Sequence, residues 1–288
     1  MKIEKYLANL EDMTDKKVIV TGGTSGIGLS IVKHLLAKHA KVIVMARNMN
    51  KADEVKNKLL ETYPDNPISF IQYNQSDKES IIKACDTIIN EHGDFYALIL
   101  NAGLIQSTKG TTYIDDIPQT IYTNFIGTSL IVDHLLYRLD GEHRIIIQGS
   151  VVAGLSIKPL NTLKIKDMKG LKQYIISKAA VEALFHYYSS KTENISFYLV
   201  EPGVTNSDII REFPPVIRKL GHIFLKTVSH SPDKAALTAM IALQENTHPN
   251  AYIIPRGFLS FMGYPKFRQF PKRRERRYFI DLVTYSHH

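Results

Sequence analysis

The chain has 288 residues, of which 44% are hydrophobic and 22% are charged, a composition typical of a globular protein with a sizeable core. Its one cysteine, Cys85, excludes an intramolecular disulfide, and we expect a cytoplasmic protein because nothing in the sequence indicates an oxidising compartment. The formal net charge is +8, but residues 266–277 hold seven basic side chains and one acidic one, so this local excess predicts no nucleic-acid-binding face.

Short, apolar and β-branched runs recur along the chain, separated by amphipathic stretches of helix length. Runs that are apolar without alternation are typical of parallel strands covered on both faces, and the stretches between them supply the crossover helices. No apolar run approaches membrane-spanning length, and the first residues lack the apolar stretch of a signal peptide. The seven predicted strands cover residues 18–20, 42–45, 68–71, 96–100, 145–147, 195–200 and 252–254.

These elements predict a single α/β domain with a doubly wound, Rossmann-type parallel sheet of about seven strands and helices on both faces. We expect the domain to cover residues 1–257 and a basic, aromatic C-terminal extension to cover residues 258–288. Two long loops, 151–169 and 205–231, follow the fifth and sixth strands. In such a sheet, long loops at the carboxyl ends of strands usually build the substrate pocket.

A glycine-rich turn, TGGTSGIG at residues 21–28, joins the first strand to the first helix of the sheet. Gly22 permits the tight turn, Gly26 lets the backbone approach a phosphate, and Gly28 lets the helix pack closely on the strand. The spacing GxxxGxG differs both from a P-loop, which ends in Gly-Lys-Ser/Thr, and from GxGxxG. By itself this turn leaves open a phosphate-binding loop and a turn without a ligand.

Further motifs follow in chain order, each at the end of a predicted strand or on a predicted helix. Together with TGxxxGxG they resemble the motifs of the short-chain dehydrogenase/reductase family, over about residues 16–254. The loop length after the fifth strand, with the stretches ARN and NFIGTSLIV, is loosely similar to the retinol-dehydrogenase-like branch, which acts on lipophilic carbonyls and alcohols. The motif residues are Asn101, Ala102 and Gly103, then Asn124, Ser150, the YxxxK pair Tyr174 and Lys178, and Pro202 with Gly203.

The resemblance implies a catalytic set of Asn124, Ser150, Tyr174 and Lys178. Tyr174 and Lys178 are four residues apart and share a helix face, so we expect the ammonium to lower the phenol pKa toward the working pH. Tyr174 is then the general acid in carbonyl reduction and the base in alcohol oxidation, while Ser150 hydrogen-bonds the reacting oxygen. By resemblance, Lys178 also binds the nicotinamide ribose and Asn124 holds a water linked to Lys178.

A nicotinamide dinucleotide is the cofactor that the resemblance implies, and Arg47 predicts which one. Arg47 follows the second strand, where an acidic residue would favour NAD, and an arginine pairs with the 2′-phosphate of NADP(H). Asn74 stands where the family often has an adenine-binding aspartate, and its amide can still donate and accept hydrogen bonds. The expected cofactor-binding residues are Gly22, Thr24, Ser25, Gly26, Ile27, Gly28, Arg47, Asn74, Asn101, Ala102, Gly103, Tyr174, Lys178, Pro202, Gly203, Val204 and Thr205.

We therefore predict an NADP(H)-dependent oxidoreductase that interconverts a carbonyl and an alcohol of a small molecule by hydride transfer. The alternatives are an NADP-binding redox sensor or scaffold, which the complete catalytic set disfavours, and a nucleotide-sugar epimerase, which usually has TGxxGxxG. We expect no metal site, because no histidine or cysteine cluster has metal-ligand spacing. The substrate, the direction and homo-oligomer formation stay open.

Aromatic residues alternate with basic ones in the C-terminal segment 258–278. Three interpretations remain open: a solvated tail, a subunit contact or lid over the substrate site, and peripheral contact with an anionic membrane surface. The aromatic residues concerned are Phe261, Tyr264, Phe267 and Phe270.

Overall fold

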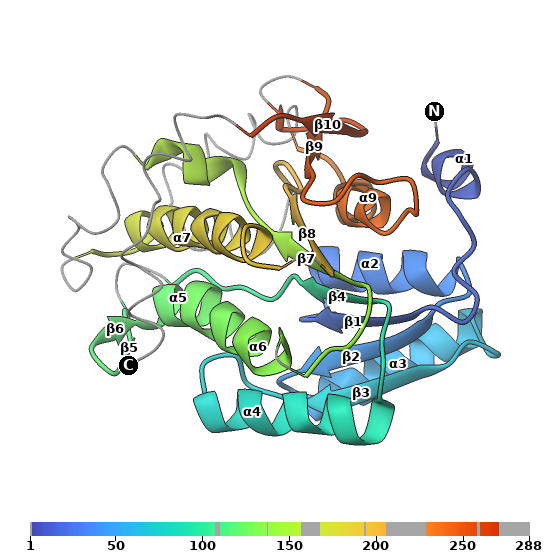
Figure 1. Cartoon of the computed structure of the whole chain (residues 1–288), viewed down its shortest axis with the longest axis horizontal. Coiled ribbons are helices and arrows are strands. Elements are labelled where there is room, and N and C mark those ends of the chain that lie inside the picture. The colour runs from blue at the N-terminus through green and yellow to red at the C-terminus, as the bar shows by residue number, and fades with distance from the viewer. Residues whose placement is uncertain are drawn as a thin grey trace.

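The computed structural model of the chain describes residues 2–106, 110–136, 138–156, 168–192, 194–205, 229–257 and 260–270. Within them, eight strands form one sheet in the order β10-β9-β8-β7-β4-β1-β2-β3, parallel throughout except for β10 (Figure 1). All seven predicted strands are present, and the doubly wound α/β fold is confirmed. The strands are β1 (Lys17–Thr21), β2 (Lys41–Ala46), β3 (Ile68–Gln72), β4 (Ala97–Leu100), β7 (His143–Gln148), β8 (Ile195–Val200), β9 (Tyr252–Pro255) and β10 (Pro265–Arg268); β5 (Tyr113–Ile114) and β6 (Ile117–Pro118) form a separate hairpin.

The eighth strand, β10, lies in the segment that the sequence suggested as a C-terminal extension. It pairs antiparallel with β9, in a register that sets Lys266 opposite Ile254 and Phe267 opposite Ile253. Only Pro265 of its four residues is buried, and the strand has no apolar pattern in the sequence, so the pairing is visible only in the folded chain. Residues 271–288 lie outside the described residues, and the domain division at residue 257 stays a prediction.

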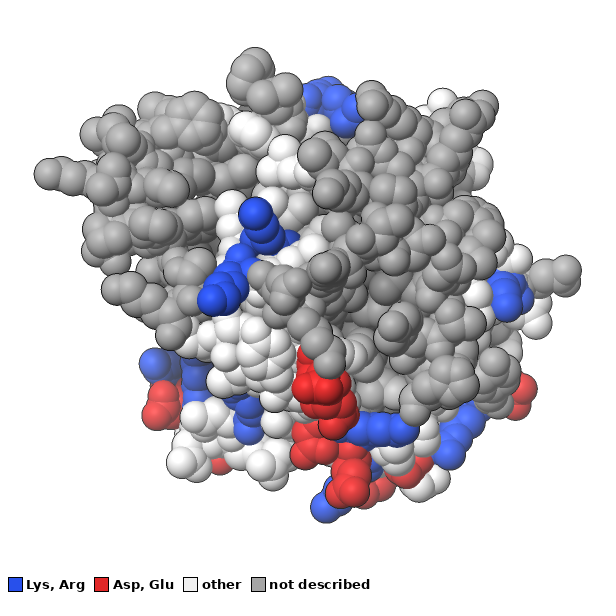
Figure 2. All heavy atoms as spheres, turned by 90° about the vertical axis from the view of Figure 1, so that its left-hand side faces the viewer, with Lys and Arg blue, Asp and Glu red and all other residues white. Residues whose placement is uncertain are grey.

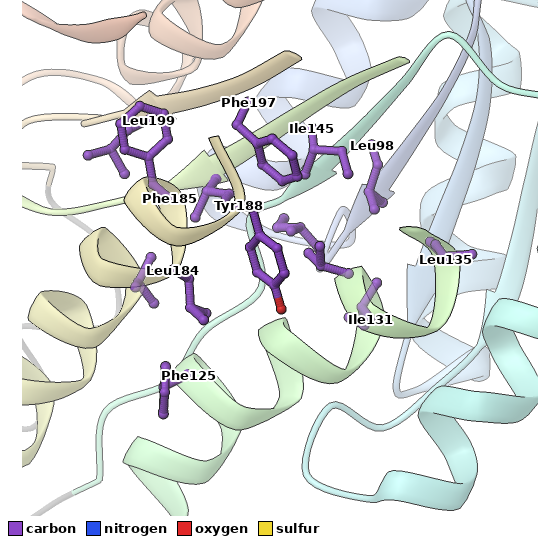
Figure 3. Close-up of a cluster of buried hydrophobic side chains, with 14 of the residues drawn as sticks. Leu98, Phe125, Ile131, Leu135, Ile145, Leu184, Phe185, Tyr188, Phe197 and Leu199 are labelled. Atoms are coloured by element: carbon purple, nitrogen blue, oxygen red, sulfur yellow. The ribbon is translucent and has the colours of Figure 1, made fainter. Parts of the chain in front are cut away.

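Helices cover both faces of the sheet (Figure 1). One face packs against α2 (Gly26–Leu36), α3 (Met49–Thr62) and α9 (Pro232–Ala242), and the other packs against α4 (Lys78–Thr87), α6 (Gly127–Leu136) and α7 (Leu171–Ser189). Figure 3 shows the second core, where Ile145 and Phe197 from the sheet meet Phe185 of α7 and Ile131 of α6. The short helices are α1 (Ile3–Ala8), α5 (Gln119–Ile121), the π-helical turns η1 (Ile88–His92) and η2 (Tyr122–Ile126), and the 3₁₀ turn η3 (Val151–Leu155).

Side-chain caps fix where several helices begin. Asn48 caps α3 by accepting a hydrogen bond from the backbone N–H of Lys51, and Asp77 caps α4 in the same way. Ser231 caps α9, which continues with a proline at its first turn. Ser25 is the N-cap residue of α2, but its side chain accepts no hydrogen bond from the helix. The first backbone N–H groups of α2 are therefore not capped by Ser25.

The direction in which the sheet is built reverses between β1 and β4. From β1 the chain adds β2 and β3 on one side, and then returns to add β4, β7, β8 and β9 on the other. Crossovers on opposite sides of this point leave a crevice at the carboxyl ends of the strands, which is where ligands bind in open α/β sheets. Figure 2 views the molecule from this end and shows acidic and basic side chains lying close together on its lower part.

Candidate active site

The glycine turn after β1 has the backbone geometry that its spacing predicts. Gly22 and Gly26 have φ values of 69° and 53°, which favour glycine. A Cβ atom on Gly28 would lie 2.3 Å from the Gly22 carbonyl oxygen and 2.5 Å from Nδ2 of Asn101, whereas a Cβ on Gly26 would meet nothing within 4 Å. Only a glycine at position 28 therefore allows α2 to pack this closely on the turn and on Asn101, whereas the backbone at Gly26 faces open space.

Thr21 clamps this turn to the Asn101-Ala102-Gly103 motif at the end of β4. The Thr21 hydroxyl accepts hydrogen bonds from the backbone N–H groups of Asn101, at 3.0 Å, and Ala102, at 2.9 Å. In return, the Asn101 amide donates to the Thr21 carbonyl at 2.9 Å. Asn101 and Ala102 thus shape the glycine turn, and the two motifs lie on either side of the switch point.

The start of α2 fits the pyrophosphate of a dinucleotide. Ser25 and Gly26 are exposed, Thr24 and Ile27 are half-buried, and the N-cap makes no side-chain hydrogen bond. The helix dipole and the unpaired N–H groups of a helix N-terminus attract a phosphate, and the open space at Gly26 lets it approach the backbone. The residues present therefore fit the group that the sequence predicts here.

Arg47 and Asn74 line one cavity of ≈ 340 Å³ at the ends of β2 and β3. Arg47 is exposed, and Asn74 is half-buried with its amide oxygen accepting from the backbone N–H of Ser76 at 3.1 Å. The cavity is thus lined by an exposed cation and an amide, and it lies at the ends of the two strands that follow β1 in the sheet. Its other lining residues are Gln72, Tyr73, Asp77, Glu79, Ser80 and Lys83.

The segment after β8 is held in a tight turn against the C-terminal part of the chain. Gly203 has a φ of 78°, and a Cβ on it would lie 2.5 Å from the carbonyl oxygen of Phe261. His230 holds the segment from the other side, with Nε2 at 2.6 Å from the Pro202 carbonyl oxygen. The predicted residues fixed in this way are Pro202, Gly203, Val204 and Thr205.

Ser150, Tyr174 and Lys178 come together at the carboxyl end of β7. Ser150 directly follows β7 and hydrogen-bonds the Tyr174 phenol. Tyr174 and Lys178 lie one turn apart on α7, with the Lys178 ammonium 6.0 Å from the centroid of the Tyr174 ring. Tyr174 is 7% exposed and Lys178 is 6% exposed, so their polar atoms lie in a nearly dry environment.

The pKa of Tyr174 departs from the sequence-based expectation. We expected Lys178 to lower it, but burial of the phenol raises the pKa of Tyr174 to about 12, against the lowering effect of the Ser150 hydrogen bond. Burial also lowers the pKa of Lys178 to about 8. The Lys178 ammonium donates to the Gln148 carbonyl at 2.9 Å. For the pKa of Tyr174, burial of the phenol outweighs the attraction to Lys178 that the four-residue spacing suggested.

Asn124 lies in the π-helical turn η2 and is almost completely buried. Its amide oxygen accepts from the backbone N–H of Leu104 at 2.8 Å, and its amide nitrogen donates to the Leu104 carbonyl and to the Ser177 hydroxyl, both at 2.9 Å. A Cβ on Gly103 would lie 3.1 Å from Oδ1 of Asn124 and 3.7 Å from Nζ of Lys178. Asn124 therefore ties the end of the β4 motif to α7, next to Lys178.

Some residues that shape this site were not predicted from the sequence. Each of them hydrogen-bonds one predicted residue. Thr21 contacts Asn101, Gln148 contacts Lys178, and Ser177 contacts Asn124. Thr21 had a signal, because it directly precedes the first glycine of the motif, whereas the other two contacts depend on tertiary packing. Glu201, which precedes Pro202, is 1% exposed and accepts a 2.5 Å hydrogen bond from the Tyr252 hydroxyl, so its carboxylate lies inside the protein.

The described ranges contain neither a cluster of metal-ligating side chains nor a helix that could span a membrane. No group of three or more histidine, cysteine, aspartate and glutamate side chains among these residues has an arrangement that could hold a metal ion. Likewise, no helix in the described part of the chain combines the length and the apolar character needed to cross a membrane.

The family model of the short chain dehydrogenases matches residues 16–215, which is more than half of the chain and includes every catalytic residue predicted above. The chain belongs to the short-chain dehydrogenase family. This short-chain dehydrogenase is 28% identical over 246 residues to human polyprenol dehydrogenase, with 79% of the chain and 72% of that protein covered. It is 27% identical over 212 residues to the 3alpha-hydroxysteroid dehydrogenase of Mediterraneibacter gnavus, with 72% and 80% covered.

Solved structures agree with the fold. A short-chain dehydrogenase from Burkholderia cenocepacia in complex with NADP superposes with a TM-score of 0.64 at 22% identity, covering 81% of this chain and 92% of that one. At this identity the likeness concerns the fold, which is the doubly wound sheet described above.

Proposed function

We propose that this short-chain dehydrogenase is an NADP(H)-dependent oxidoreductase that interconverts a carbonyl and an alcohol, with Tyr174 as the general acid and base. The observation that carries the proposal is the hydrogen bond between the buried Tyr174 phenol and Ser150, with Lys178 one helical turn away. These groups stand at the carboxyl end of β7, on the same end of the sheet as the glycine turn. An acid, an oxygen-binding hydroxyl and a dinucleotide cradle are the parts that carbonyl reduction needs.

The bound nicotinamide supplies the hydride for reduction and takes it up in oxidation. In reduction, Oη of Tyr174 gives its proton to the substrate oxygen as the substrate carbon gains the hydride. Because the pKa of Tyr174 is raised to about 12, the phenol is protonated at neutral pH, as a general acid must be. The Ser150 hydrogen bond and the Lys178 ammonium stabilise the phenolate that remains, and oxidation runs through the same groups in reverse.

The preference for NADP(H) over NAD(H) rests on Arg47. Its guanidinium is exposed at the rim of the cavity that also contains Asn74, beyond the start of α2 where the pyrophosphate fits. A guanidinium pairs in a bidentate way with a phosphate, and a 2′-phosphate distinguishes NADP(H). A structure of the same fold, from Burkholderia cenocepacia, is a complex with NADP.

For the substrate we propose a lipophilic alcohol or carbonyl compound. The names of the human and Mediterraneibacter gnavus relatives refer to a polyprenol and a hydroxysteroid, both lipophilic alcohols. In addition, Leu155, in the turn that follows Ser150, exposes 62% of its surface near the expected pocket. Three further aliphatic residues of the same loop, Ile157, Leu160 and Leu163, lie outside the described residues. We retain a cytoplasmic setting as part of the proposal, because Cys85 is buried and has no second cysteine to pair with.

Replacing Tyr174 by phenylalanine tests the proposed chemistry. We expect Tyr174→Phe to bind NADPH as the unchanged protein does and to lose about 100- to 10,000-fold of its turnover, the range attributed to general acid catalysis. NADPH binding is measured by fluorescence, and turnover by NADPH oxidation with a panel of ketones, aldehydes, steroids and retinoids.

Tyr187→Phe, on the same helix, is the matched control, and it should keep its turnover. Equal turnover in Tyr174→Phe and the unchanged protein would remove Tyr174 from the mechanism. If the unchanged protein bound NADPH tightly but oxidised it with no member of the panel, the result would contradict the oxidoreductase proposal and favour the alternative of an NADP-binding redox sensor.

A further inference from the structure

The loop after β3 reaches from the Arg47 cavity to the turn that carries Asn124. Asn74 lines the cavity, and the next residue, Gln75, is 6% exposed and points its amide away from it, into η2. Nε2 of Gln75 donates to the Thr123 carbonyl at 2.8 Å and to the Thr128 hydroxyl at 3.1 Å. Two adjacent residues of one loop therefore face two different parts of the candidate site.

The backbone of Asn124 is held by the same group of contacts. The Thr128 hydroxyl, which accepts from Gln75, donates to the Asn124 carbonyl at 2.7 Å. Side chains thus bind the carbonyls of both Thr123 and Asn124 in a wide π-helical turn, a form that is rare and less favourable than a regular α-helical turn. The hydrogen bonds from Gln75 and Thr128 therefore stabilise the π-helical turn at the position of Asn124.

Packing fixes Gln75 in this position. A Cβ on Gly127 would lie 2.3 Å from the Gln75 carbonyl oxygen, so the loop backbone presses directly on the helix. The buried Tyr73 hydroxyl donates to Oε1 of Gln75, which sets the amide nitrogen toward Thr123. Polar contacts therefore run from Tyr73 through Gln75 to η2.

We propose that Gln75 is a positioning residue that holds η2 so that the Asn124 amide stays on Leu104 and Ser177. Its catalytic consequence rests on the proposed function, because only then does the Asn124 position affect turnover. Loss of the Gln75 amide lets η2 relax, which weakens the hydrogen bond from the Leu104 N–H to Asn124 and shifts the groups around Lys178. The loop after β3, which carries Asn74, and the turn η2, which carries Asn124, are thereby coupled through one side chain.

Gln75→Met removes the amide and nearly preserves the length and volume of the side chain. In the folded variant without added ligand, we expect the backbone amide of Leu104 to exchange with deuterium about tenfold faster, the factor for roughly one net hydrogen bond. With NADPH and a carbonyl substrate from the panel, kcat should fall about 10- to 100-fold, as expected for a small displacement remote from the reacting atoms. The dissociation constant of NADPH should change by less than about threefold, because Arg47 and the glycine turn are unaltered.

Gln244→Met is the matched control. The Gln244 amide oxygen accepts from the Glu11 N–H and its amide nitrogen donates to the Met240 carbonyl. Gln244 follows the end of α9 and lies far from the candidate site. It should leave Leu104 exchange and kcat unchanged. If Gln75→Met does not fold, Thr128→Val removes the next hydroxyl in the same contacts and should give the same faster exchange.

Unchanged Leu104 exchange in a folded Gln75→Met or Thr128→Val variant would overturn the proposal, whatever the turnover. Faster exchange with no turnover even in the unchanged protein would support the positioning role and contradict the proposed function instead. Faster exchange with unchanged kcat would overturn the catalytic consequence of the contact.

Discussion

Arg47 and Asn101 are both predicted cofactor-binding residues, but their polar side chains differ in whether they already have hydrogen-bonding partners within the protein. Asn101 and Thr21 satisfy one another, so Asn101 shapes the site through the backbone of the glycine turn. Arg47 is exposed on the rim of a cavity, and none of the ion pairs found among the described residues includes it. Its guanidinium is therefore available to a phosphate.

Arg47→Ala should weaken NADPH binding much more than NADH binding. Charged hydrogen bonds of this kind contribute about 1.5–3 kcal/mol, so we expect the dissociation constant of NADPH to rise about 10- to 100-fold and that of NADH to change little. Isothermal titration with both dinucleotides measures the two constants. Arg268→Ala, which removes an exposed arginine from β10 at the other edge of the sheet, is the control. Equal losses for NADPH and NADH in Arg47→Ala would contradict the assignment of the 2′-phosphate to Arg47.

At the scale of the element, β10 joins the C-terminal part of the chain to the domain. β10 closes the edge of β9, and Phe270 just beyond it is 9% exposed and packs its ring on His186 of α7 and on Tyr252 of β9. Its neighbour Phe267, within β10, is 57% exposed. The two aromatic residues, which look alike in the sequence, therefore differ in their contribution to stability.

We expect Phe270→Ala to lower the free energy of unfolding by about 3 kcal/mol, at the low end for a buried phenylalanine, because it leaves a cavity against α7 and β9. Phe267→Ala should change it by less than about 0.5 kcal/mol, as is usual for surface positions. Urea unfolding followed by circular dichroism measures both variants. A similar effect of the two substitutions would show that the C-terminal contacts do not stabilise the sheet.

At the scale of the whole molecule, the sheet brings residues from distant parts of the chain to one end and buries some of their charges. Lys178 is the clearest case, since its pKa falls from an ordinary 10.5 to about 8. Between these pH values the unfolded chain binds a proton that the folded chain has released, and stability therefore rises with pH. Tyr174 opposes this only above about pH 10, where the unfolded chain loses a phenol proton that the folded chain retains up to about 12.

The unchanged protein should therefore gain stability relative to Lys178→Met by roughly 2 kcal/mol between pH 8 and pH 10. Urea unfolding of both proteins at several pH values in this range measures the difference. Lys172→Met, at an exposed position of α7, controls for the loss of an ammonium group. A difference that fell over this range would contradict a buried, weakly basic Lys178.

Much of the fold and of the candidate site follows from local patterns in the sequence. Apolar, β-branched runs predicted the seven parallel strands, because a strand covered on both faces needs apolar side chains on both. The spacing of Gly22, Gly26 and Gly28 predicted the turn, because a positive φ or a close approach admits only glycine. The four-residue spacing of Tyr174 and Lys178 likewise predicted their common helix face.

The tertiary structure alone decided the features that depend on distant neighbours. The strand β10 exists because β9 offers it an edge, since its own residues have no strand pattern. The pKa of Tyr174 rises instead of falling because desolvation depends on everything packed around the phenol and not on the spacing to Lys178. The contact of Gln75 with η2 joins residues 48 positions apart, and no local pattern predicts it. Periodicity and backbone constraints are encoded locally, whereas burial and long-range hydrogen bonds exist only once the chain is folded.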